Sequence, residues 1–145
     1  MKKRLPEPSS ELEHVENFID EIILPQKQVQ LNSLFAVFHT IETLVKLQPQ
    51  YSDVFRGVLN KKKRLSKLAG ENHMTFYAEY DSQLEKIIEQ LDEIEDLLAA
   101  DLEKNIEKHD EVIADFLLLL SHQISALTIN YVVINEMLSI YYEQY

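Results

Sequence analysis

The scarcity of glycine and proline constrains this chain more than any other feature. Its 145 residues hold two glycines and four prolines, and residues 71–145 hold neither. Turns between β-strands draw heavily on these residues, so an all-β fold of this length would need many more of them. Apolar residues recur instead at the three- and four-residue spacing of helices. The chain is therefore predicted to be all-α.

The amino-terminal part divides at its prolines. Residues 1–10 are expected to be an extended segment. Ser10 and Glu13 have the spacing of a capping box, in which the two side chains bind backbone N–H groups at a helix start. A first helix is therefore predicted over about 11–24. Pro25 is expected to end or sharply kink it, because proline lacks the N–H that a helix interior needs.

Two further helices are predicted before the second glycine. One covers about 26–47, where Pro49 stops it, and its apolar residues extend beyond a single stripe. This helix is expected to be buried on more than one side. The other covers about 52–69, with Gly70 placed as the left-handed residue that commonly ends a helix.

Residues 71–145 are predicted to form two long helices, since a single helix of this length is unusual outside a coiled coil. The apolar stripe that begins near Leu84 loses its register after Leu98, and a new stripe begins at Val112. A turn is expected within 103–110, and the two helices are expected to form an antiparallel hairpin. One continuous helix with a stutter is the alternative.

The five predicted helices would form one domain over residues 11–145. This length is typical of a single domain, and a content of 46% hydrophobic and 27% charged residues is that of a globular chain. The sequence contains neither an internal repeat nor a low-complexity segment. The prediction is a single-domain bundle of about five helices.

The last predicted helix is unusually apolar. From Val112 to Tyr142 its only charged residues are Asp115 and Glu136. The stretch approaches the length of a membrane span, but polar residues near its middle and the lack of basic residues after Lys108 argue against one. We expect a central bundle helix that is buried on most faces. Where the chain alone does not cover it, a second copy or a protein partner is expected to do so.

The end of the chain is aromatic and almost uncharged. Tyr141, Tyr142 and Tyr145 are candidate contact residues, because tyrosine combines a large apolar body with a polar tip and is enriched at interfaces. Simple packing at the end of the helix is the alternative.

Six basic residues and no acidic ones lie in the stretch 56–67. A solvated helix face is the plainest interpretation. The basic run also fits the loose pattern of a nuclear-localisation signal. Contact with nucleic acid or an acidic lipid surface is a third interpretation, which no RNA-binding or zinc motif supports. The six are Arg56, Lys61, Lys62, Lys63, Arg64 and Lys67.

The next predicted helix carries the opposite charge. Five carboxylates lie three or four residues apart on one helix face, where like charges repel. We expect a compensating surface, either the basic helix 52–69 packed antiparallel or a basic partner protein. The residues lack the loop and glycine of a calcium site, so no metal is expected. The five are Glu85, Glu89, Asp92, Glu93 and Asp96.

The sequence lacks recognisable catalytic equipment. It contains no cysteine, and its five histidines include one reversed His-x-x-Glu pair, His39 and Glu42. Di-iron bundles use Glu-x-x-His pairs on facing helices, so this pair is better explained as an ordinary polar face. Walker, nucleophile-elbow and HExxH motifs are absent. We predict a non-enzyme that needs neither cofactor nor metal.

Charge and cysteine content narrow the functional classes. A net charge of −11 disfavours general nucleic-acid binding. The lack of cysteine fits an intracellular, cytoplasmic protein, or a nuclear one if the basic run is a signal. The leading prediction is a helical interaction subunit or adaptor that presents apolar and acidic faces to a protein partner or a second copy. The alternatives are a small acidic immunity- or antitoxin-type neutraliser of a basic target, and a nucleic-acid-associated factor that uses helix 52–69.

Overall fold

The computed structural model describes residues 13, 14, 16–68 and 73–144. The described residues form helices and no strand, which confirms the all-α prediction. The predicted extended segment 1–10 and the predicted stop at Gly70 lie outside them. The elements are a π-helical turn η1 (Ile19–Ile23) and the helices α2 (Leu24–Leu47), α3 (Tyr51–Leu68), α4 (His73–Glu107) and α5 (Glu111–Gln144).

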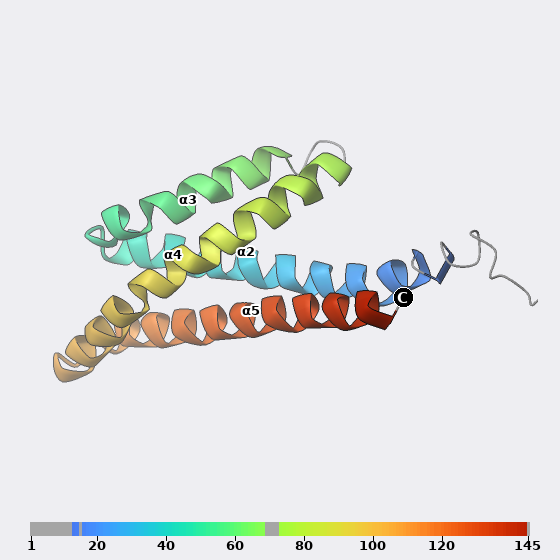
Figure 1. Cartoon of the computed structure of the whole chain (residues 1–145). Helices are drawn as coiled ribbons and strands as arrows, with labels where there is room; N and C mark the ends of the chain where they lie inside the picture. Colours follow the sequence, from blue (N-terminus) through green and yellow to red (C-terminus); the bar gives the residue numbers. More distant parts are fainter. Residues whose placement is uncertain (1–12, 15, 69–72, 145) are drawn as a thin grey trace, which may run out of the picture.

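The helices predicted over 11–24 and 26–47 are not separate, so the number of five helices is not confirmed. Residues 16–18 are helical and lead into η1, which passes directly into α2 (Figure 1). Pro25 lies in the first turn of α2, directly after the π turn. Proline donates no N–H and crowds the carbonyl four residues earlier. The wider π turn accommodates this irregularity without ending the helix.

The four helices contact one another in a ring, because α2 and α4 each contact both α3 and α5. In Figure 1, α3 lies above and α5 below the place where α2 and α4 pass each other. All four helices contribute fully buried side chains to one continuous core, represented by Phe38, Phe55, Leu91 and Leu120. Burial of each such side chain contributes about 1.5–3 kcal/mol of transfer free energy.

α4 ends at a short connection, residues 108–110, which lies inside the interval predicted for a turn. His109 adopts a left-handed conformation with φ of 60°. The N–H of His109 donates to the carbonyl of Ile106 (3.1 Å), and the N–H of Asp110 donates to the carbonyl of Asn105 (2.9 Å). This is the hydrogen-bond pattern of a Schellman motif, in which glycine usually takes the left-handed position. Histidine ends the helix here.

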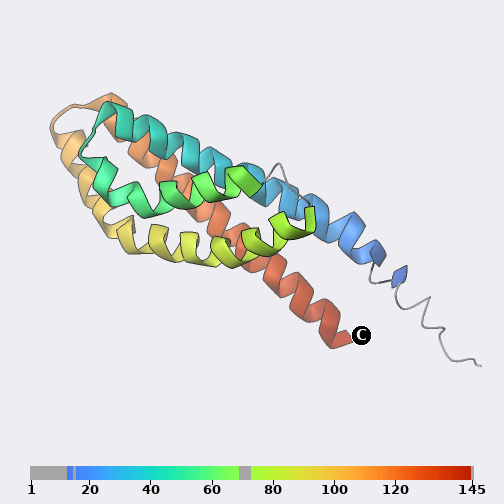
Figure 2. The same ribbon diagram turned by 90° about the horizontal axis from the view of Figure 1, so that it is seen from above.

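Asp110 then begins the last helix. Its side chain accepts a hydrogen bond from the backbone N–H of Ile113 (3.3 Å), as a capping residue does. α5 runs back in the opposite direction to α4 and contacts it. Away from the connection the two helices diverge in Figure 1 and cross each other in Figure 2. The close antiparallel hairpin predicted from the sequence is therefore not confirmed.

Candidate interaction surface

The chain covers only one side of α5. The prediction that this helix is buried on most faces is wrong, since 33% of its most apolar stretch is buried. α2 and α4 cover the inner side, where Leu120 and Leu127 are fully buried. α3 packs on α2 and α4 instead and leaves the outer side open. The large exposed apolar side chains of α5 are Val112, Leu118, Leu119, Ile129, Val132, Val133, Ile140 and Tyr142.

Six of these eight residues, all except Ile129 and Tyr142, follow a seven-residue repeat that begins at Val112. Leu119, Val133 and Ile140 are separated by multiples of seven, and Leu118 and Val132 repeat the pattern one position earlier. Such a repeat keeps side chains on one side of a helix and is typical of surfaces that pack against another helix. From one end to the other this outer face is about 45 Å long, at about 1.5 Å per residue.

Polar groups run along the middle of the outer face. Asp115, His122 and Glu136 are exposed and lie at seven-residue intervals on either side of Ile129. Ile129 is the most exposed of the large apolar residues, at 63% of its full surface. The surface is therefore apolar along its flanks and acidic near both ends of its central line.

A groove between α4 and α5 borders this face. It widens beside Ile129 into a hollow of about 230 Å³. Its α4 side carries two exposed carboxylates, Asp92 and Glu95, neither of which forms an ion pair within the described part of the chain. An apolar wall therefore meets an acidic wall here. The α5 side consists of Ile124, Ser125, Thr128 and Ile129.

The five predicted carboxylates of α4 form no ion pair with the described residues of the basic helix, contrary to one of the two predicted alternatives. α3 does pack against α4, but its ion pair to α4 joins Arg64 to Glu79. The hydrogen bond from Arg64, aided by one from Gln83, lowers the pKa of Glu79. The five predicted acidic residues, Glu85, Glu89, Asp92, Glu93 and Asp96, are exposed, and none of them forms an ion pair in the described ranges.

The five carboxylates stay without an ion pair to α3 because α3 packs against a different side of α4. A Cβ atom added at Gly57 would lie 2.9 Å from Nε2 of Gln90, which shows how closely α3 and α4 approach there. α3 therefore covers the side of α4 that carries Gln90. The predicted acidic stripe lies on a different side of α4 and faces solvent.

The basic cluster of α3 is partly neutralised within the bundle. Half of its six residues form ion pairs with carboxylates of α2, α3 or α4, while Lys63 and Lys67 are exposed and Lys61 is half-buried. Lys62, Lys63 and Lys67 border a hollow of about 320 Å³ that also contains Glu42. The cluster thus consists of three ion-paired residues and three residues without an ion pair among the described residues. The three pairs are Lys62 with Glu42 at 2.7 Å, Arg56 with Asp53, and Arg64 with Glu79.

The carboxy-terminal tyrosines differ from one another. The ring of Tyr141 is half-buried and stacks on Phe18, with centroids 4.0 Å apart and planes within 2°. The Tyr142 side chain is exposed and meets Tyr141 edge-on. Tyr145 lies outside the described residues. Tyr141 therefore contributes to packing near the start of the chain, and Tyr142 remains a surface residue.

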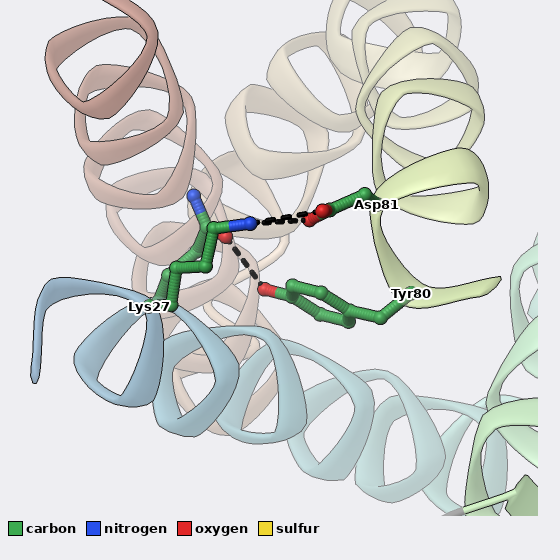
Figure 3. A network of polar contacts seen from close by, with 4 residues as sticks. Lys27, Tyr80 and Asp81 are labelled. Carbon is green, nitrogen blue, oxygen red and sulfur yellow. Dashed lines mark hydrogen bonds and ion pairs between the residues drawn. The ribbon is translucent and has the colours of Figure 1, made fainter. Parts of the chain in front are cut away.

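A polar network that the sequence did not reveal ties α2 to α4 (Figure 3). Nζ of Lys27 donates to both carboxylate oxygens of Asp81 at 2.9 Å. The hydroxyl of Tyr80, which is fully buried, donates to Oε1 of Gln30 at 2.8 Å. These residues are far apart in the sequence, and no local motif marks them. Lys27, Gln30 and Asp81 also line a separate hollow of about 220 Å³ between α2, α4 and α5.

A second hydrogen bond joins α3 to α4 near the connection. The hydroxyl of Tyr51 donates to Oδ2 of Asp101 at 2.7 Å. Burial raises the pKa of Tyr51, and the hydrogen bond to Asp101 and its negative charge raise it further. Because the ring of Tyr51 is buried while its hydroxyl is held by a carboxylate, this contact is expected to position the two helices.

The described residues offer one membrane-span candidate and no cluster of metal ligands. By length and composition alone α5 is sufficient to cross a membrane, a test that core helices of soluble proteins also pass. No group of three or more His, Asp or Glu side chains arranged to hold a metal occurs among the residues that the structure describes. Comparison with protein-family models, curated proteins and solved structures gives no match.

Proposed function

We propose that this protein is a non-catalytic interaction subunit that binds a protein partner through the outer face of α5. The observation that carries the proposal is the row of eight large apolar side chains exposed along α5, six of which follow a helix-packing repeat. A half-exposed apolar side chain leaves on the order of 70 Å² in water, so eight of them leave roughly 500–600 Å². The largest patch of a typical monomer is of about this size and is often functional.

The area also suits an interface. A standard protein interface takes about 800 Å² from each partner, and it surrounds an apolar centre with polar groups. The exposed residues of α5 supply most of that area, and the neighbouring carboxylates of α4 supply a polar rim. A partner helix laid along this face would contact side chains at seven-residue intervals, which is how amphipathic helices bind grooves.

A membrane-spanning role is less well supported. His122, Gln123 and Asn130 lie within the apolar stretch of α5 and would have to enter the hydrocarbon core, where polar and ionisable side chains are costly. The inner face of α5 is packed against α2 and α4, and the exposed surface of α4 carries many charges. Insertion would require α5 to leave this core.

Site-directed photo-crosslinking in cells of the native host tests the proposal. The full chain would carry benzoylphenylalanine at Ile129, with the exposed Asn60 on α3 as the control position. We expect a discrete adduct, to another protein or to a second copy, from position 129 alone. Val132→Asp, on the same face, should abolish that adduct. Identical adducts from both positions, or none from position 129, would overturn the proposal.

Vesicle flotation separates the membrane alternative. The purified full chain would be mixed with vesicles of phosphatidylcholine and phosphatidylglycerol and centrifuged through a density gradient. We expect the protein to stay at the bottom. Flotation that Val132→Asp abolishes would assign the face to lipid and would contradict the proposed function.

A further inference from the structure

We infer that the groove between α4 and the outer face of α5 binds a basic amphipathic helix of another protein, with its apolar stripe on α5 and its lysines or arginines beside Asp92 and Glu95. The inference rests on the proposed interaction function and specifies the chemistry of the partner. Three features of the groove support it: its apolar wall, its acidic wall without an ion pair, and the absence of lysine and arginine among the described residues that line it.

The apolar wall supplies the docking surface. Ile129 lies at the edge of the 230 Å³ hollow and is also the most exposed apolar residue of α5. A side chain of a partner helix can therefore enter the hollow while its neighbours, three, four and seven residues away, rest on the flanking apolar residues of α5. This arrangement is the helix-in-groove mode of recognition.

The acidic wall selects the charge of the partner. Residues 87–103 of α4 contain no lysine or arginine, and none occurs in α5. Asp92 and Glu95 lack an ion pair in the described part of the chain, and Asp115 and Glu136 add further negative charge along the outer face. Complementary charges steer association and exclude partners of like charge.

The same charges argue against a second copy as the occupant. Another copy that packed through this same face would bring an acidic α4 and an α5 without basic residues to the groove, in a chain whose net charge is −11. Like charges would then face each other along the groove. A basic partner instead supplies the compensation that the acidic stripe does not receive from α3.

Fluorescence anisotropy with designed peptides tests the inference on the full-length protein in 0.15 M salt. The first labelled peptide places leucine at helical intervals with lysine on both flanks. The second replaces every lysine with glutamate. The third has the composition of the first in an order without helical periodicity. We expect the first to bind at least tenfold more tightly than the third, with an affinity that falls as salt rises, and the second not to bind.

Matched variants locate the binding to the groove. Asp92→Asn combined with Glu95→Gln should weaken the first peptide roughly three- to tenfold, as expected for two exposed ion pairs. Glu103→Gln combined with Glu107→Gln removes the same charge from exposed positions of α4. These positions lie beyond the Debye length of about 8 Å from the hollow, so the change should be less than twofold. Ile129→Ser should also weaken binding, and melting curves check that each variant is folded.

The outcomes distinguish this inference from the function on which it rests. Equal binding of the periodic and aperiodic peptides, or equal losses in the two double variants, would show nonspecific attraction and overturn the inference. If no peptide binds while position 129 still crosslinks, the interaction face stands and the basic partner is wrong. Sedimentation that shows a dimer abolished by Ile129→Ser would assign the groove to a second copy. If no peptide binds and position 129 gives no crosslink, both proposals are wrong.

Discussion

α3 and α5 relate to the same bundle in opposite ways. α3 buries one apolar stripe, including Phe55 and Leu65, against α2 and α4 and turns its charged residues to water. α5 has apolar residues around most of its circumference, yet the bundle covers it on one side. The stripe of α3 is therefore explained by folding alone. The outer half of α5 is not, because its large apolar side chains stay about half-exposed in the part of the chain that the structure describes, and this difference is the reason to assign it to binding.

The same charge introduced on the two sides of α5 is expected to have very different effects on stability. Leu120→Asp puts an unpaired carboxylate into the core, where Leu120 has no exposed surface, and should cost 4 kcal/mol or more by the order of magnitude for such changes. Leu118→Asp, two positions away on the outer side, should change stability by about 0.5 kcal/mol or less. Urea unfolding followed by circular dichroism measures both. Similar losses would mean that the outer side is also core.

The covered side of α3 can be tested at its first residue. Tyr51→Phe removes the hydrogen bond to Asp101 and should cost about 1–2 kcal/mol near neutral pH. The pKa of Tyr51 is raised in the folded protein above its unfolded value of about 10. Above that pH the unfolded chain releases this proton first, so the stability of the parent should fall as the pH rises.

A pH series of urea midpoints provides the measurement. The parent should lose stability above about pH 10 faster than Tyr51→Phe does, since the variant has no hydroxyl to ionise. Identical pH dependence in the two proteins would show that the Tyr51–Asp101 contact contributes nothing to the docking of α3.

α4 ends at a residue whose backbone conformation is strained. His109 holds a left-handed conformation that costs a non-glycine residue about 1 kcal/mol. His109→Gly should therefore stabilise the protein by about that amount and raise Tm by about 2–4 °C. His109→Ala is the control, because alanine pays a similar cost and should leave Tm nearly unchanged. A lower Tm for His109→Gly would contradict the assigned helix end.

The smallest effect is expected on the charged side of α3. Lys62 and Glu42 form an ion pair in which both side chains are partly exposed. Such pairs contribute about 0–1 kcal/mol, so Lys62→Ala should shift the urea midpoint only slightly. A loss comparable with that of Leu120→Asp would show that this pair holds α2 and α3 together and would weaken the contrast between the two helices.

The sequence predicted correctly the helix bounds and the turn that depend on residues close together in the chain. The third helix was predicted over about 52–69 and spans Tyr51–Leu68, and the turn expected within 103–110 lies at 108–110. The prediction of two separate helices divided at Pro25 was wrong. Proline is tolerated in a first helical turn, and the preceding π turn accommodates its ring. The periodicity of the outer face of α5 was also present in the sequence, where it was taken as part of one broad buried surface.

The sequence by itself determined that the chain is helical and where its later helices begin and end, because these depend on residues within a few positions of one another. It also determined which residues of α5 share a face. Only the tertiary structure decided which of those faces is covered, since that depends on where α3 packs. It likewise decided that Arg64 pairs with Glu79 and that Asp92 and Glu95 stay unpaired. Such contacts join helices far apart in the chain, and helical periodicity carries no information about them.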